Sequence, residues 1–426
     1  MGNPPTELIR CARAIASGEE RNDYAFVVRD GTIADAGDFK TIHERNREVP
    51  ARAFPADRLV IPGLINGHSH AYQILLRGWA DDMPFEQWRD EALYRIVPKL
   101  APEDVYWVFV AAFSEMLAAG ITTVVEFFYL NGGGNAHAEA VINAAEATGM
   151  RLVLARAWMD NPKAPAEFRE SVDQARTRTL ELRAKYPPST ICVAPHSLHG
   201  ASEEMLRAAA RFAREEACDL HIHVAERPDP AGQISALDRL GVLSERTVAV
   251  HAIHVTEEEK DVLASRGARV VYNPTTNLYL GDGIADVSGF RRRGIPIGLG
   301  TDANVKPSIL GEMRAASYLQ KIRCRNGQAL GAVAAYRMGT LDGARAVGVL
   351  AGDLTAGAAS AADFIVLDAS GVDPWSPARN AVVYRAEAHW VRATFVNGRR
   401  VYAGQPSPLA LAARSELAAL ARRLQL

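Results

Sequence analysis

The chain of 426 residues has few cysteines and no long apolar run. Its four cysteines are scattered, without the Cys-x-x-Cys spacing of a zinc or redox motif: Cys11, Cys192, Cys218 and Cys324. This usage favours reduced thiols over a disulfide framework or a cysteine-based zinc site. No stretch approaches the ~18 consecutive apolar residues of a transmembrane helix, and residues 1–10 contain no apolar signal core. We therefore expect a cytoplasmic protein with no membrane partner.

Net charge is also nearly absent. Lysine and arginine total 48 against 50 for aspartate and glutamate, which gives a net charge of −2. This balance provides no electrostatic attraction for nucleic acid or anionic lipid, so we expect neither as a partner. With 48% hydrophobic and 23% charged residues, the composition also excludes a disordered or fibrous chain.

Short apolar runs rich in β-branched residues recur along the chain, with helical patterns between them. The runs lie at 59–65, 121–127, 151–157, 190–195, 219–224, 247–252, 269–273 and 296–300. Amphipathic helices are predicted at 102–119, 137–149, 166–186, 202–217 and 256–266, with starts at Ser202 and Thr256. Eight strands alternating with helices predict an α/β fold, a parallel (β/α)8 TIM barrel. A doubly wound sheet is disfavoured because residues 66–70, Asn-Gly-His-Ser-His, are no glycine-rich phosphate loop.

Both ends of the chain have a different, β-rich pattern. Residues 24–38 predict a hairpin around Asp30-Gly31, and the runs 363–367, 381–386 and 391–403 are strand-like. Because these segments flank the barrel, we expect them to meet in one small β-sandwich. The predicted division is 1–58 and 351–426 for the sandwich, the latter including a terminal helix at 408–426, and 59–350 for the barrel.

Histidines gather where the barrel strands end. Of the chain's 11 histidines, eight lie at predicted carboxyl ends of strands, the edge where barrel enzymes place their chemistry: His68, His70, His196, His199, His221, His223, His251 and His254. His68 and His70, two apart on an extended strand end, project to one side and can bind one metal ion. His223 and Asp302, at the ends of the fifth and eighth strands, complete a donor set that suits a divalent ion such as Zn2+.

Two further residues can move protons at such a site. Glu226 lies three residues after His223 and can transfer a proton from metal-activated water; the alternative is a helix-start carboxylate. His251 ends the sixth strand and can polarise the bond under attack; the alternative is a supporting role behind the ligands.

These motifs together resemble the amidohydrolase superfamily over nearly the whole chain. They are Pro62-Gly63-Leu64-Ile65-Asn66-Gly67-His68-Ser69-His70, His221-Ile222-His223-Val224-Ala225-Glu226, Val250-His251-Ala252 and Gly300-Thr301-Asp302. The resemblance implies His68, His70, His223 and Asp302 as metal ligands, Glu226, His251 and Asp302 as catalytic residues, and His196 as a substrate contact. It also implies one metal, Zn2+ or else Fe2+, because Pro195-His196-Ser197 stands where binuclear branches carry a carboxylated lysine. A homodimer or larger homo-oligomer is the corresponding expectation for assembly.

Within the superfamily, two substrate signatures compete. Leu75–Asp82, Phe85-Glu86-Gln87-Trp88 and Asn273–Leu278 resemble the adenosylhomocysteine and thiomethyladenosine deaminases, but 94–99 lacks the glutamate with which they hold ribose. His68–Gln73, Glu126–Tyr129 and Leu280–Ile284 are shared with formiminoglutamate deiminases, but His199 replaces their carboxylate-binding arginine.

We expect a small-molecule substrate and a hydrolytic deaminase acting on an amino-substituted heterocycle of purine, pterin, nucleoside or triazine type. The alternatives are a formimino or amidine deiminase, a triazine-type chlorohydrolase and a non-catalytic scaffold; no expected ligand is missing, which disfavours the last. A planar substrate could stack on an aromatic side chain while polar groups read its edges, although these aromatics could equally serve in packing. The candidates are Trp79, Trp88, Phe128 and Tyr129 for stacking, and Gln73, His196 and His199 for the polar edges.

Overall fold

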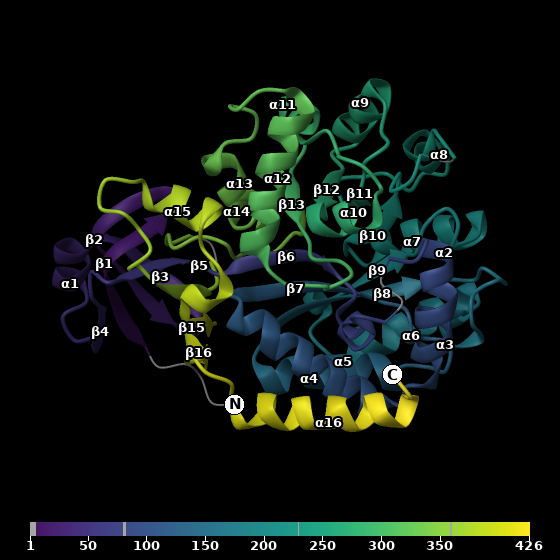
Figure 1. Ribbon diagram of the computed structural model, residues 1–426, viewed down its shortest axis with the longest axis horizontal. Helices are drawn as coiled ribbons and strands as arrows, with labels where there is room; N and C mark the ends of the chain where they lie inside the picture. Colours follow the sequence, from purple (N-terminus) through teal and green to yellow (C-terminus); the bar gives the residue numbers. More distant parts are fainter. Residues whose placement is uncertain (1–5, 80–81, 229, 358–359) are drawn as a thin grey trace.

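Eight parallel strands form a ring in the computed structural model, which describes residues 6–79, 82–228, 230–357 and 360–426 (Figure 1). In chain order they are β6 (Leu64–Ser69), β7 (Ile121–Phe128), β8 (Arg151–Trp158), β9 (Ile191–Pro195), β10 (Leu220–Val224), β11 (Thr247–His251), β12 (Arg269–Tyr272) and β13 (Ile297–Leu299). The first and last strands meet where the amides of Thr301 and Asp302 each donate to the carbonyl of His68 at 3.0 Å. The predicted (β/α)8 barrel is confirmed.

Helices cover the outside of the barrel (Figure 1). They are α4 (Pro102–Ala118), α5 (Ala136–Thr148), α6 (Val172–Lys185), α7 (Glu203–Glu215), α8 (Gln233–Arg239), α9 (Glu257–Ser265), α11 (Val287–Arg292), α12 (Ile309–Cys324), α13 (Ala332–Met338) and α14 (Leu341–Ala346). The short helix α10 (Pro274–Leu280) instead lies at the carboxyl edge of the barrel, directly after β12. Ser202 and Thr256 cap the amino ends of α7 and α9, as predicted. The helix predicted at 166–186 begins only at Val172, because Ser171 accepts the amide of Gln174 and caps it there.

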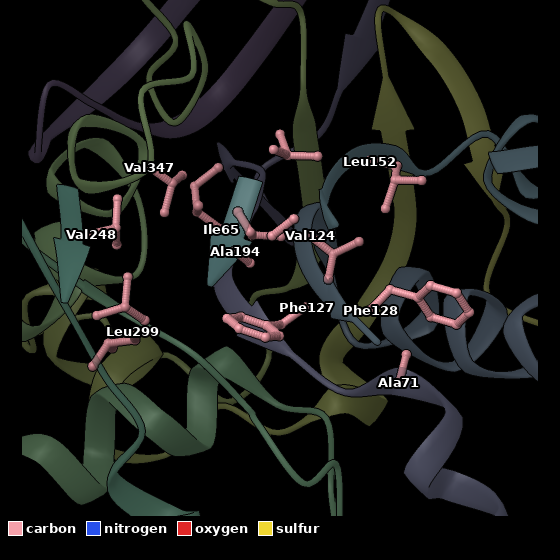
Figure 2. Packing of buried hydrophobic residues seen from close by; sticks show 14 of the residues in the cluster. Ile65, Ala71, Val124, Phe127, Phe128, Leu152, Ala194, Val248, Leu299 and Val347 are labelled. Carbon is pink, nitrogen blue, oxygen red and sulfur yellow. The ribbon is translucent and has the colours of Figure 1, made fainter. Parts of the chain in front are cut away.

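The barrel is filled with apolar side chains. All residues of β7, β9, β10 and β11 are buried, polar ones included, as expected for parallel strands that are covered on both faces. Ile65, Val124, Ala194, Val248 and Leu299 belong to one cluster of buried hydrophobic residues, which Figure 2 shows at close range. This packed interior supports the strand ends that carry the histidines.

Strands from both ends of the chain form a second sheet beside the barrel (Figure 1). Its order is β16 (Arg399–Tyr402), β15 (Val391–Val396), β14 (Phe364–Asp368), β5 (Arg58–Pro62), β1 (Glu7–Ala16), β2 (Glu19–Arg29) and β3 (Thr32–Asp38), with β4 (Ala51–Phe54) also paired to β1. Helix α1 (Phe39–Arg45) follows β3. Phe364 stacks on Phe395 and meets Phe26 edge-on, so strands from both termini share one core. The turn at Asp30-Gly31 has positive φ at both residues, as the predicted hairpin requires.

Two strand predictions were wrong. The run at 59–65 is two strands in different sheets, β5 and β6, separated at Gly63, where a side-chain Cβ would lie 2.1 Å from Oγ1 of Thr122. The run at 381–386 lies mostly in helix α15 (Ala378–Tyr384), which begins after Pro377 and buries Val382 and Val383. The predicted terminal helix is α16 (Pro408–Leu424), which lies along α4 (Figure 1). In the described part of the chain, no helix is both long and apolar enough to cross a membrane.

Candidate metal centre and active site

Three imidazoles converge at the carboxyl ends of β6 and β10. Nε2 of His223 lies 3.2 Å from Nε2 of His68 and 3.2 Å from Nε2 of His70. All three side chains are at least nine-tenths buried. The strand-end positions of these residues therefore bring the predicted donors together, as two-residue spacing and a parallel barrel require.

The hydrogen bonds at the far side of two rings define which nitrogen carries the lone pair. Nδ1 of His70 lies 2.8 Å from the carbonyl of Phe127, and Nδ1 of His223 lies 2.9 Å from the carbonyl of His196. Because a carbonyl only accepts, each Nδ1 carries the proton and each Nε2 presents a lone pair. Burial, with the nearby His68, lowers the pKa of His70 to about 3, and burial also lowers that of His223. Neutral imidazoles with facing lone pairs repel one another unless a cation lies between them, so these residues fit a metal ion.

Asp302 adds a carboxylate to the three imidazoles. Its Oδ1 lies 3.3 Å from Nε2 of His68 and 3.6 Å from Nε2 of His70. Burial opposes its ionisation, but the hydrogen bond to His68 and the surrounding histidines hold the pKa of Asp302 below its usual range. Asn66 fixes the preceding turn, since its amide donates to Thr301 Oγ1 at 2.7 Å and accepts from Thr301 N at 3.0 Å. Two groups of three closely spaced donors therefore share His68: one is His68, His70 and His223, and the other is His68, His251 and Asp302.

His251 and Glu226 adjoin the three imidazoles and Asp302. Nε2 of His251 lies 3.6 Å from Oε1 of Glu226 and 3.9 Å from Oδ2 of Asp302. Burial raises the pKa of Glu226 to about 7, which is the range in which a carboxylate can both accept and release a proton at neutral pH. The structure thus brings all the residues predicted as ligands or catalytic groups into one cluster.

Two asparagines orient His251, and sequence reasoning assigned them no role. Nδ2 of Asn277 lies 3.0 Å from Nδ1 of His251 and also donates to Oδ2 of Asp282 at 3.0 Å; Nδ2 of Asn273 lies 3.2 Å from the same ring nitrogen. Because the Asp282 carboxylate only accepts, the Asn277 amide must turn Nδ2 toward both groups. His251 therefore presents Nε2–H to the two carboxylates. The signal available in the sequence was the position of Asn273 directly after the seventh barrel strand.

A cavity of about 420 Å³ opens over the cluster. Of the predicted substrate contacts, five line it: Gln73, Trp88, Tyr129, His196 and His199. His199 is exposed at this wall, whereas Tyr129 and Gln73 are buried. Trp79 is not among the described residues that line the cavity, and the guanidinium of Arg95 lies over its ring at 5.4 Å.

Three other predicted positions lie away from the cavity. Phe128 packs in the core against Tyr72 and Phe109. His221 is fully buried within β10, and Nε2 of His254 bonds to the carbonyl of Asp282 at 2.7 Å. Residues 80 and 81 of the motif Leu75–Asp82 lie outside the described residues.

A parallel barrel with three histidines and an aspartate at its carboxyl edge is the architecture of metal-dependent hydrolases. Residues 59–401 match the model of the amidohydrolase family, and the chain belongs to that family. It is 31% identical over 392 residues to the 5'-deoxyadenosine deaminase of Methanothermobacter thermautotrophicus, covering 88% of each chain. It is 30% identical over 422 residues to a 5-methylthioadenosine/S-adenosylhomocysteine deaminase of Nitratidesulfovibrio vulgaris, covering 94% and 93%.

Solved structures agree with this assignment. A zinc-bound adenosine deaminase from Xanthomonas campestris superposes with a TM-score of 0.89 at 25% identity, and the match covers 100% of both chains. The superfamily resemblance drawn from the histidine motifs is confirmed by the family match.

Proposed function

We propose that the protein is a metal-dependent hydrolase that releases ammonia from an amino-substituted heterocycle. The observation that carries this proposal is the convergence of three imidazole Nε2 atoms, two of them with their lone pairs facing inward, and Asp302 beside Glu226 and His251 at a cavity. The deaminase relatives support the same chemistry.

One divalent ion would be held by His68, His70, His223 and Asp302. Zn2+ suits three imidazoles and a carboxylate, with Fe2+ as the second candidate. When bound, the ion supplies positive charge that lowers the pKa of water toward ~7 and stabilises developing negative charge on the substrate carbon's oxygen.

The chain's own residues account for the proton movements. Glu226, whose pKa is about 7, takes a proton from the attacking water and returns it to a ring nitrogen of the substrate. The second water proton passes by way of Asp302 to the departing nitrogen, which leaves as ammonia while the carbon keeps the oxygen. His251, held with its proton on Nε2, donates a hydrogen bond to the oxygen that forms. Trp88 and Tyr129 would stack on the ring, and Gln73, His196 and His199 would bind its polar edges.

Ammonia release tests the proposal. Metal-replete protein is assayed with amino-pterins, aminopurines, nucleosides, aminotriazines and formimino acids. Glu226→Gln, which removes the proton acceptor, is expected to lower kcat by about 10²–10⁴-fold. Glu146→Gln, an exposed glutamate in α5, is the matched control. Absence of ammonia from every compound, with one metal ion bound per chain, would contradict the proposal and favour a different leaving group such as chloride.

A further inference from the structure

The outer part of the cavity is apolar. Phe85, Trp88 and Leu93 line it from residues 85–93, Leu280 from the end of helix α10, and Val305 from the loop after β13. Val305 is 50% exposed, which places an apolar surface at the entrance. Each methylene group buried against such a wall strengthens binding about fourfold.

The cationic side chains of the cavity wall are already paired. The described lining contains three arginines, and each has a carboxylate partner: Arg77 with Glu115 at 2.8 Å, Arg89 with Asp90 at 2.8 Å, and Arg227 with Glu86. Arg227 also lies over the ring of Phe85, 4.7 Å from its centroid. A carboxylate or phosphate on a substrate would therefore meet cations whose charge is already compensated, and Nη2 of Arg77 is the buried guanidinium donor of this wall without a hydrogen-bond partner among the described residues.

The carboxylates of the wall are engaged as well. Among the described lining residues they are Glu86, which pairs with Arg227, and Glu226 and Asp302, which belong to the catalytic cluster. None is free to bind a vicinal diol or an ammonium group in the outer cavity. The inner wall differs, because Oε1 of Gln73 is buried without a hydrogen-bond partner and can accept from a substrate N–H.

We propose, on the basis of the deaminase function above, that the substrate is a neutral amino-heterocycle with an apolar substituent and no ribose or charged tail. The ring occupies the inner cavity, where its N–H groups meet Gln73 and its reacting carbon meets the four proposed metal ligands. The substituent lies against Phe85, Leu280 and Val305. The Glu86–Arg227 pair at this wall is the specificity determinant that disfavours anions, because the Glu86 carboxylate compensates the positive charge of Arg227.

Binding of matched probes tests this inference. Calorimetry of the metal-loaded protein compares 9-butyladenine, 9-(3-carboxypropyl)adenine, 9-(3-aminopropyl)adenine and adenosine, together with butylamino-, carboxypropylamino- and aminopropylamino-substituted aminotriazines. In at least one ring series, the butyl compound is expected to bind at least tenfold tighter than its charged counterparts and adenosine. Equal or tighter binding of a charged probe or adenosine would overturn the inference, as would failure of both butyl compounds to bind at millimolar concentration.

A variant distinguishes the contribution of the ion pair to selectivity from the contribution of the apolar wall. Glu86→Gln frees Arg227, so the affinity for the carboxypropyl probe relative to the butyl probe is expected to rise about tenfold. Glu103→Gln, an exposed glutamate in the first turn of α4, is the control and should leave this ratio unchanged. An unchanged ratio in E86Q would refute the role of the pair.

Ammonia measured in the same samples distinguishes the two proposals. Tight butyl-probe binding without ammonia release from any probe contradicts the deaminase function and leaves the selectivity result intact. Ammonia release from adenosine or a carboxylate probe in preference to the butyl probe overturns the selectivity and leaves the deaminase function intact.

Discussion

The proton position on His251 depends on Asn277, and replacing this amide tests the proposed role of the imidazole. The Asn277 Nδ2 donor lies 3.0 Å from Nδ1 of His251, and Asn273 supplies a second donor at 3.2 Å. Asn277→Ala removes one of the two donors, and one hydrogen bond contributes about 0.5–1.5 kcal/mol. We therefore expect kcat/KM for ammonia release to fall about two- to twelvefold, since RT ln 10 is about 1.4 kcal/mol.

Asn277→Asp is nearly isosteric but has the opposite hydrogen-bonding character. A carboxylate in this place accepts from Nδ1–H, which moves the lone pair to Nε2 and points it at the carboxylates of Glu226 and Asp302. An imidazole held in the wrong tautomer costs on the order of 10³-fold or more in rate, so N277D should be much less active than N277A. Metal content and Tm of both variants control for loss of the ion or of the fold. Activity of N277D equal to or above that of N277A would refute the assigned tautomer.

Three further predictions concern stability. Chelation of the metal should lower Tm, and added Zn2+ should restore it. Binding stabilises the folded state by about 2.7 kcal/mol when the free ion is at 100 times its Kd. An unchanged Tm would argue against a bound ion. Burial raises the pKa of Glu312 to about 8 despite two hydrogen bonds from Thr275, so the folded protein retains a proton that the unfolded chain loses near pH ~4.3. The stabilisation that this retained proton gives the folded protein is complete below pH ~4.3 and is lost as the pH rises to 8. The Tm of Glu312→Gln should therefore fall less between pH 6 and pH 9 than the Tm of the wild type. Arg156→Met removes one of the two arginines that pair with the buried Glu170 carboxylate, to which Arg156 donates at 2.7 and 2.8 Å and Arg178 at 2.7 Å, and should cost about 1.5–3 kcal/mol in chemical denaturation; an unchanged free energy of unfolding would contradict this role.

Much of the fold and the donor cluster follows from periodicity alone. Strands that are buried on both faces appear as short apolar runs, and parallel strands bring their carboxyl ends to one edge. Residues such as His68, His223 and Asp302, which are 234 residues apart at most, could therefore be placed together before any coordinates were known. The two-residue spacing of His68 and His70 needs only the alternation of an extended chain.

One strand boundary and several contacts of the site depend on individual side-chain contacts. The division of β5 from β6 depends on how closely Gly63 approaches Thr122, a residue 59 positions away. The stacking of Trp79 on substrate stays a prediction, and the contact of its ring with Arg95, 16 positions away, is one that the sequence does not display. The role of Asn277 depends on Asp282, which determines the direction of its amide. None of these relations has a repeating pattern that a sequence could display.

The backbone at the strand ends also has a conformation that hydrophobic patterning does not predict. His251 and Asp302 both have positive φ, at 73° and 47°, in the left-handed region that side chains with a Cβ rarely adopt. The barrel maintains this geometry through local hydrogen bonds: the amide of Asp302 donates to the carbonyl of His68 at 3.0 Å, and Asp302 in turn accepts from the amide of His70 at 2.9 Å. The cost of the Asp302 conformation, about 1–3 kcal/mol, is therefore offset by hydrogen bonds formed where the barrel closes. The same closure sets both the direction of the Asp302 carboxylate and its distance to the histidines, so the fold and the donor geometry have one physical origin.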